Sequence, residues 1–93
     1  MQVTNIDTTL NERGARYGTF QGHAEVTQGL KRFMANELAK RNKTISDTQW
    51  EALEMIAHKI GRIINGDPNY ADHWHDVAGY ATLVDKELTG TIV

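Results

Sequence analysis

The stretch from Ser46 to Asn65 constrains the fold of this chain more than any other. Ser46 and Gln49 have the spacing of a capping box, in which each side chain bonds the other residue's backbone N–H and a helix begins. Apolar residues then recur at steps of three and four, which places them on one side of a helix at about 100° per residue. They are Trp50, Leu53, Ala57, Ile60 and Ile64. We expect a helix whose apolar stripe belongs to the core.

A second stripe runs along the edge of the first and carries polar side chains. It consists of Glu51, Glu54, His58 and Arg62. Two carboxylates one turn apart can chelate a hard cation such as Mg²⁺, which prefers oxygen ligands. Glutamate pairs of this spacing are also common on solvated helix surfaces, so both interpretations of Glu51 and Glu54 stay open.

Two further long helices are expected on either side of this one. Residues 20–41 carry apolar residues at helical spacing, with Thr19 as N-cap: Val26, Leu30, Phe33, Met34 and Leu38. Residues 70–88 carry a similar core stripe: Trp74, Val77, Ala78, Ala81, Val84 and Leu88. The short connector between residues 65 and 69 predicts that the last two helices are antiparallel neighbours, with Gly66 as a left-handed stop.

The ends of the chain carry weaker signals. Asp7 or Thr8 can cap a short helix that runs through Arg16, and Gly18 is typical of a helix stop. We expect flexible ends at about residues 1–6 and 89–93. No strand pattern is present, so the sequence predicts a single all-α domain over residues 1–93, built as a small antiparallel helical bundle.

Composition limits the partners of such a domain. The formal net charge is −2 and the basic residues are dispersed, which argues against binding of duplex nucleic acid. There is no cysteine, no signal-peptide pattern and no run of the ~20 apolar residues that a membrane span needs, so we expect a cytoplasmic protein without membrane contact. Helices in so small a chain often leave an apolar face uncovered, so we expect a homodimer or higher homo-oligomer to complete the bundle.

The acidic pattern on the last two helices resembles a known family. Glu51-x-x-Glu54, the basic Lys59 and Arg62, a short connector and an acidic cluster ending at Asp76 resemble the all-α nucleoside triphosphate pyrophosphatases of the MazG-like and dimeric dUTPase-like group. Small phage and prophage members look most similar, on two motifs: Glu12-Arg13-Gly-x-x-Tyr17-Gly18 and Asn65-Gly-Asp-Pro-x-Tyr-x-Asp72-x-Trp74-x-Asp76-x-Ala-Gly-Tyr80-Ala. The resemblance covers about residues 10–88, and it places the chain in the host cytoplasm if a phage encodes it.

This resemblance implies a Mg²⁺-dependent pyrophosphohydrolase that releases a nucleoside monophosphate and pyrophosphate. It assigns catalysis to Glu51, Glu54 and Asp76, and Mg²⁺ binding to the same three residues together with Asp72. The family pattern has Glu three residues before Asp76, where this chain has His73. Asp72 lies one residue earlier on the same helix face and is the expected substitute.

Seven further residues are candidates to contact the substrate: Arg13, Tyr17, His58, Lys59, Arg62, His73 and Tyr80. Lys59 or Arg62 can contact phosphate oxygens, although such residues more often pair with an acidic residue four positions away. Tyr17 can stack on a base, or equally pack the first helix onto the bundle. The alternative to the hydrolase is a non-catalytic protein that sequesters a nucleotide or a nucleotide-derived signal. A third possibility is a structural bundle whose acidic stripe is solvated surface.

Overall fold

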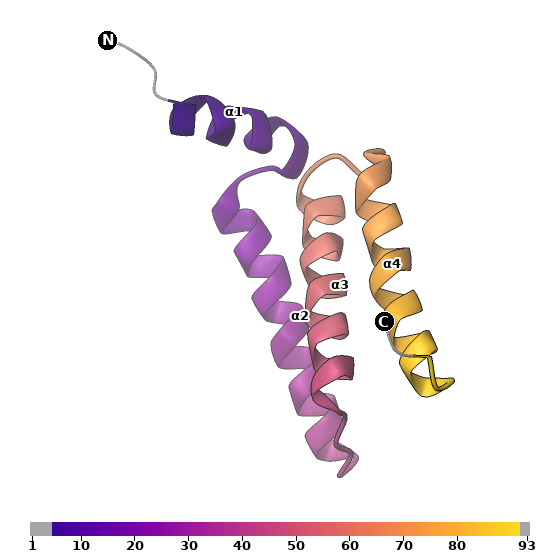
Figure 1. Cartoon of the computed structure of the whole chain (residues 1–93). Helices are drawn as coiled ribbons and strands as arrows, with labels where there is room; N and C mark the ends of the chain where they lie inside the picture. The colour runs from indigo at the N-terminus through magenta and orange to yellow at the C-terminus, as the bar shows by residue number, and fades with distance from the viewer. Residues whose placement is uncertain (1–4, 92–93) are drawn as a thin grey trace.

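The computed structural model of the chain describes residues 5–91, and every regular element in that range is a helix. They are α1 (Asn5–Tyr17), α2 (Phe20–Lys40), α3 (Asp47–Asn65) and α4 (Ala71–Leu88). The three long helices lie side by side with α3 in the middle, and each runs antiparallel to the next (Figure 1). The short α1 crosses the end of this layer where α2 begins and α3 ends. The all-α fold class is confirmed.

Local side-chain chemistry sets the beginnings of α2 and α3 as expected. The Ser46 hydroxyl accepts from the Gln49 backbone N–H at 3.1 Å, and the Gln49 side chain accepts from the Ser46 backbone N–H at 2.9 Å. The Thr19 hydroxyl accepts from the Gly22 backbone N–H at 3.1 Å. Each side chain bonds a backbone donor that has no partner inside the helix, which explains why sequence alone locates these starts.

The chain ends differ from the prediction where the structure describes them. Helix α1 begins at Asn5, before the expected caps, and Asp7 lies in its first turn, where a negative charge favours the helix dipole. Residues 5 and 6 are therefore helical. Residues 89–91 leave α4 through a turn, and the expectation for residues 1–4 and 92–93 lies outside the described range.

The prediction for Gly66 is wrong, and the reason is a contact distant in sequence. Gly66 has φ −122° and ψ −133°, so it does not adopt the left-handed conformation. A Cβ at this position would lie 2.3 Å from the carbonyl oxygen of Arg16 and 2.4 Å from the Cα of Tyr17. Glycine therefore lets the end of α1 pass close to the α3–α4 connector. Gly18, with φ +78°, does adopt the left-handed conformation expected at the end of α1.

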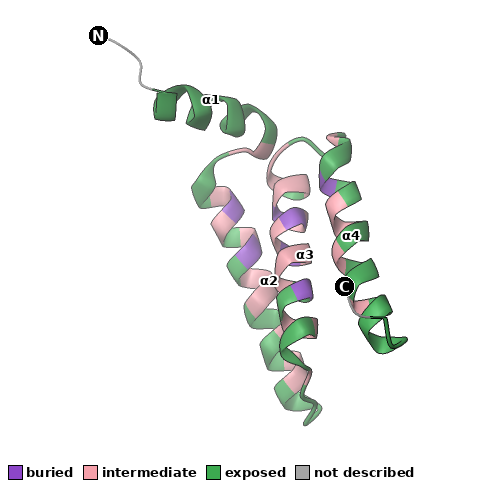
Figure 2. Ribbon diagram, in the orientation of Figure 1, coloured by how far each residue is buried: buried purple, intermediate pink, exposed green. Residues whose placement is uncertain are grey.

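The predicted core stripes are only partly buried. Among the described residues the buried apolar side chains are those of Ala52 and Ala57, and α1 buries none (Figure 2). Several predicted core residues are exposed instead: Phe33, Leu53, Ile64, Trp74 and Leu88. In the part of the chain that the structure describes, α2 and α4 do not contact each other. Each side of the layer is therefore left without a covering helix, and α3 is buried only where it meets its two neighbours.

Candidate functional site

The pocket that unites most of the expected substrate contacts lies where α1 crosses α2 and α3. Its volume is about 500 Å³. Its lining comes from three helices and the α1–α2 turn: Leu10, Arg13, Gly14, Tyr17, Gly18, Thr19, Phe20, His23, His58 and Arg62. Four of the seven residues expected to contact substrate thus share one concave surface: Arg13, Tyr17, His58 and Arg62.

Asn65 fixes the position of the α1–α2 turn, whose residues line this pocket. Its side-chain amide donates to the carbonyl oxygens of Tyr17 and Thr19, each at 2.8 Å. Next to it, the backbone N–H of Asp67 donates to the carbonyl oxygen of Arg16 at 2.7 Å. The end of α3 is therefore fastened to the α1–α2 turn, which fixes how α1 crosses the layer.

A stack of rings and guanidinium groups runs beside the pocket. The Arg62 guanidinium carbon lies 4.2 Å from the ring centroid of Tyr17, and the rings of Tyr17 and His73 have centroids 5.3 Å apart. His73 is buried and stacks on Tyr70 at 4.9 Å, and Arg16 lies 5.0 Å from the Tyr70 centroid. Tyr17 therefore contacts Arg62 of α3 and His73 of α4, and it also lines the pocket. His73 contacts Tyr17 but is not part of the pocket lining.

Two cations and one exposed ring give the pocket its chemical character. No carboxylate within residues 5–91 forms an ion pair with Arg13 or Arg62. Phe20 stands beside them with 84% of its surface exposed, an unusual position for a large apolar ring. Phe20 could not be recognised from the sequence, because the first residue after an N-cap is ordinarily assigned to the helix start and nothing local indicates its exposure.

The imidazoles of His23 and His58 meet across the α2–α3 contact. Nε2 of His23 lies 3.1 Å from Nδ1 of His58, so one ring donates and the other accepts. Burial, reinforced by the nearby Arg62 guanidinium, lowers the pKa of His58 to about 4. The same two causes lower the pKa of His23. Both rings are therefore neutral at pH 7, and the positive charge of the pocket comes from its arginines. His23 was missed because its partner is 35 positions away on another helix.

Lys59 lies on the other side of α3 and contacts α4. It is buried, and its Nζ lies 2.8 Å from Oδ2 of Asp76. The hydrogen bond from Lys59 lowers the pKa of Asp76, which stays ionised at neutral pH. Lys59 therefore pairs with an acidic residue, as one of the two expectations for it stated. The partner is Asp76 on α4, however, and not a residue four positions away on α3.

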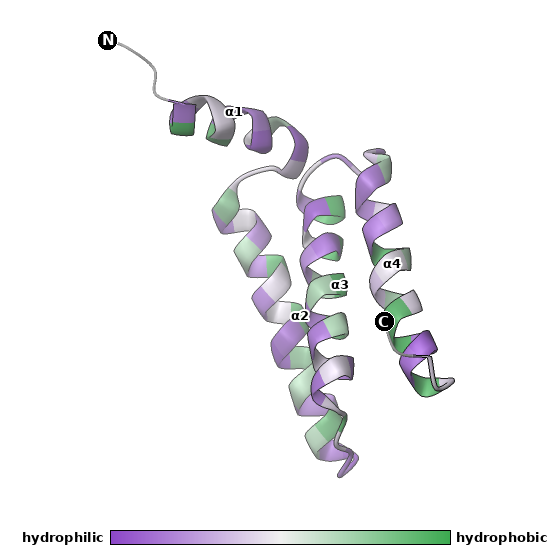
Figure 3. Cartoon of the chain, in the orientation of Figure 1, coloured by the Kyte–Doolittle hydropathy of each residue, from purple (hydrophilic) through white to green (hydrophobic). Residues whose placement is uncertain are grey.

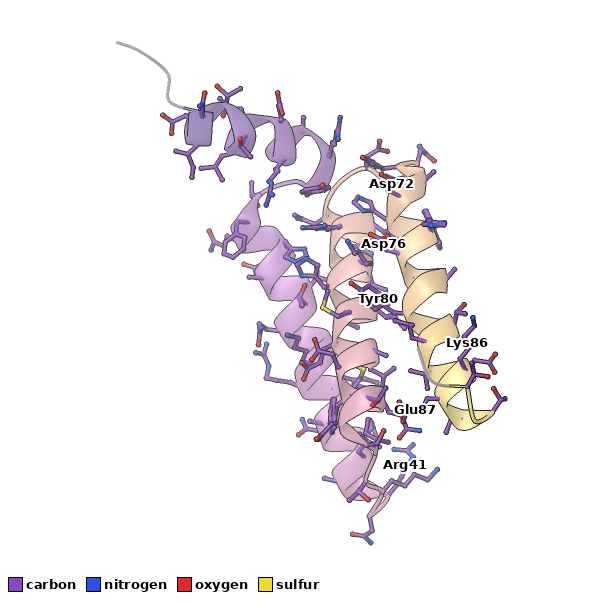
Figure 4. The ribbon with its side chains drawn as sticks, viewed as in Figure 1. Arg41, Asp72, Asp76, Tyr80, Lys86 and Glu87 are labelled. Carbon is purple, nitrogen blue, oxygen red and sulfur yellow. The ribbon has the colours of Figure 1, made fainter. Side chains whose placement is uncertain are left out.

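The expected metal ligands are distributed along α3 and α4. Glu51 is exposed and lines a hollow between the two helices together with Tyr80, while Glu54 is half-buried one turn further on. Asp72, Asp76 and Tyr80 follow one another along α4 (Figure 4). The nearby Asp72 carboxylate raises the pKa of the Tyr70 phenol. Over residues 5–91 no three His, Asp or Glu side chains lie close enough together to hold a metal ion. Within residues 5–91 the carboxylates expected to bind Mg²⁺ therefore do not form one cluster.

Comparison with known proteins places the chain in a family. A family model described as a domain of unknown function, DUF6378, matches residues 4–88. The chain therefore belongs to this family. No curated protein and no solved structure matches it. Within the described residues, no helix is both long and apolar enough to cross a membrane.

Proposed function

We propose that this member of the DUF6378 family binds a nucleotide or a nucleotide-derived small molecule in the pocket between α1, α2 and α3. The observation that supports this most is the presence of two guanidinium groups without carboxylate partners among residues 5–91, beside an exposed aromatic ring, in a pocket of about 500 Å³. Small-molecule sites commonly have volumes of about 300–1,000 Å³ with few polar groups among apolar ones.

Each part of the pocket matches one part of a nucleotide. A guanidinium group binds phosphate oxygens through two parallel N–H donors, so Arg13 and Arg62 suit the phosphates. Phe20 offers a ring face on which a base can stack, and Leu10 adds apolar surface to the lining. Nδ1 of the neutral His58 is engaged by His23, so its Nε2 is the nitrogen suited to a hydrogen bond with the sugar or base.

Binding without turnover is the form of this proposal that the geometry favours. Hydrolysis of a triphosphate needs charge stabilisation at the reacting phosphorus, usually from metal ions held by several carboxylates. Here Asp76 is paired with the buried Lys59. Among the residues that the structure describes, no carboxylate lines the pocket itself. Sequestration of a nucleotide or a nucleotide signal needs none of these groups.

Calorimetric titration of the wild-type protein with linear and cyclic nucleotides tests the proposal. Arg62→Met retains an apolar stem against Tyr17 but removes the phosphate donors, so we expect affinity to fall about 10-fold or more, which is ~1.4 kcal/mol. Arg32→Met, on the exposed surface of α2 outside the pocket, is the matched control and should bind as the wild type does. Equal affinity in Arg62→Met and wild type, with both folded by circular dichroism, contradicts the assignment.

A second candidate is the Mg²⁺-dependent nucleoside triphosphate pyrophosphohydrolase. It is favoured by the position of Glu51, which shares one side of α3 with His58 and Arg62 at about 100° per residue. A carboxylate pair thus lies about 10 Å along the helix from the pocket at 1.5 Å per residue. Pyrophosphate release in the presence of Mg²⁺ that is lost in Glu54→Gln supports this candidate. Nucleotide binding without any release leaves the binding protein.

A further inference from the structure

An apolar surface extends across the layer on the side away from His58 and Arg62. Leu53 lines two hollows on this side, one against α2 with Phe33 and Met34, and one against α4 with Ala81 and Val84. Helical spacing at about 100° per residue adds neighbours of these residues on the same side. We name the whole set the apolar face: Phe33, Leu53, Ile56, Ile60, Ile64, Trp74, Val77 and Ala81.

The apolar face is too large to belong to an isolated chain of this size. Ile64 is 66% exposed, Phe33 63% and Trp74 56%. Apolar residues are spread along all three long helices, as Figure 3 shows, yet within residues 5–91 only two alanines form the buried apolar core. Burial of large apolar side chains is the main driving force of folding, so a stable form of this chain requires a cover for this face.

Surface area indicates the size of that cover. The chain exposes 6954 Å², whereas a compact monomer of 10.5 kDa exposes about 5400 Å² by the usual scaling with mass. The excess over the whole chain, the exposed α1 included, is about 1500 Å², which is of the order of the ~1,000–2,500 Å² that each partner contributes to an obligate homodimer. The radius of gyration, 16.0 Å, also exceeds the ~12 Å of a compact domain of this length.

We propose that a second copy of this chain packs on the apolar face, so that two three-helix layers form one closed bundle. Domains are ordinarily built from two packed layers around one core, and this chain supplies a single layer. The face carries both protruding side chains and hollows of about 420 and 350 Å³, so a two-fold axis through it can place the projections of one copy in the hollows of the other.

The charges at the edge of the face are compatible with this contact. Glu37 borders the hollow beside Phe33 and is already neutralised by Arg41 and Lys40 on its own helix end. Its burial at a rim therefore leaves the Glu37 carboxylate paired, while Arg41 and Lys43 border the same hollow. The pocket proposed for nucleotide lies toward the opposite side of α3 and stays open in this dimer. Failure of the dimer proposal would therefore leave the nucleotide proposal intact, and failure of the nucleotide proposal would leave the dimer proposal intact.

Sedimentation velocity of three proteins tests the proposal. Wild type should sediment at twice the 10.5 kDa chain mass, and Ile64→Glu should shift to the monomer with a lower Tm, because a charge cannot be buried at the contact. Leu83→Glu is the matched control: Leu83 is 45% exposed, but it lines the hollow with Glu51 and Tyr80 on the other side of α4. This control should stay dimeric. A monomeric wild type with a concentration-independent Tm, or an Ile64→Glu protein as associated as wild type, overturns the proposal.

Trp74 gives a second readout that does not depend on a destabilised variant. Trp50→Phe leaves Trp74 as the only tryptophan, on the apolar face. In the associated protein its emission should be blue-shifted, and it should move to longer wavelength as dilution releases the monomer. Emission typical of a water-exposed indole in the fully associated protein overturns the assignment of this face.

Discussion

The imidazole of His58 lines the pocket and at the same time exchanges a hydrogen bond with His23. Burial and the Arg62 charge keep this ring neutral at pH 7. Because its Nδ1 is engaged by His23, only Nε2 is left to bond a ligand. A single residue thus links the stability of the layer to the chemistry of the proposed site.

The lowered pKa of His58 predicts that stability depends on pH in the acid range. Above the unfolded value of 6.5 the ring is neutral in both states, so it has no effect. Between pH 6.5 and about 4 the unfolded chain takes up the proton first, so stability falls as pH falls. We expect a loss on the order of 1 kcal/mol by pH 5, after allowance for partial solvent screening.

Urea unfolding at pH 7 and pH 5 measures this loss. His58→Gln should lose less stability between the two values than wild type, because the glutamine does not titrate. His75→Gln, at an exposed position on α4, should retain the full wild-type loss. An identical loss in wild type and His58→Gln contradicts the role of this ring.

At the scale of the elements, contacts between the turns determine how α1 is placed against the three long helices. The side-chain amide of Asn65 donates to two carbonyl oxygens of the α1–α2 turn, and Gly66 lets that turn approach. Helix starts at Thr19 and Ser46 could be predicted because their hydrogen bonds span three residues. The conformation of Gly66 could not be predicted, because it is determined by contacts with Arg16 and Tyr17, about 50 positions earlier in the sequence.

Asn65→Asp should destabilise the protein without changing its shape. The substitution replaces an N–H donor by a carboxylate oxygen that faces two carbonyl oxygens, and the loss of such partly buried bonds costs about 1–3 kcal/mol. Chemical denaturation measures the change. Asn36→Asp, on the exposed surface of α2, makes the same replacement and should change stability by about 0.5 kcal/mol or less. Equal effects of the two variants contradict the fastening role of Asn65.

At the scale of the whole molecule, sequence predicts the fold class but not the burial. Periodicity shows which side of each helix is apolar, and it identifies Leu53 and Ile64 correctly as members of one apolar side. It does not show whether the same chain covers that side. The three long helices form one layer, so Ala57 is buried against its neighbours whereas Leu53 and Ile64 of the predicted α3 core are exposed.

The candidate site was predictable to a similar extent. Arg13, Tyr17, His58 and Arg62 meet in the pocket, although they come from segments about 40 positions apart. The three other candidates, Lys59, His73 and Tyr80, lie outside the pocket. In a flat layer of three helices, the contacts of a residue depend on which side of its helix it occupies. The expected convergence of Glu54 with Asp76 depends on a register that sequence does not contain, and Asp76 pairs with Lys59.

A nuclear magnetic resonance titration of the isotopically labelled protein tests the central claim most directly, with the tightest-binding nucleotide of the calorimetric panel as ligand. We predict that the largest backbone amide shifts fall in residues 13–23 and 58–62, around the two arginines and Phe20. The resonances of Glu51 and Tyr80, which lie further along the layer and do not line the pocket, should move little. Shifts centred on Glu51 and Tyr80, or no shifts with any nucleotide in the panel, would contradict the account.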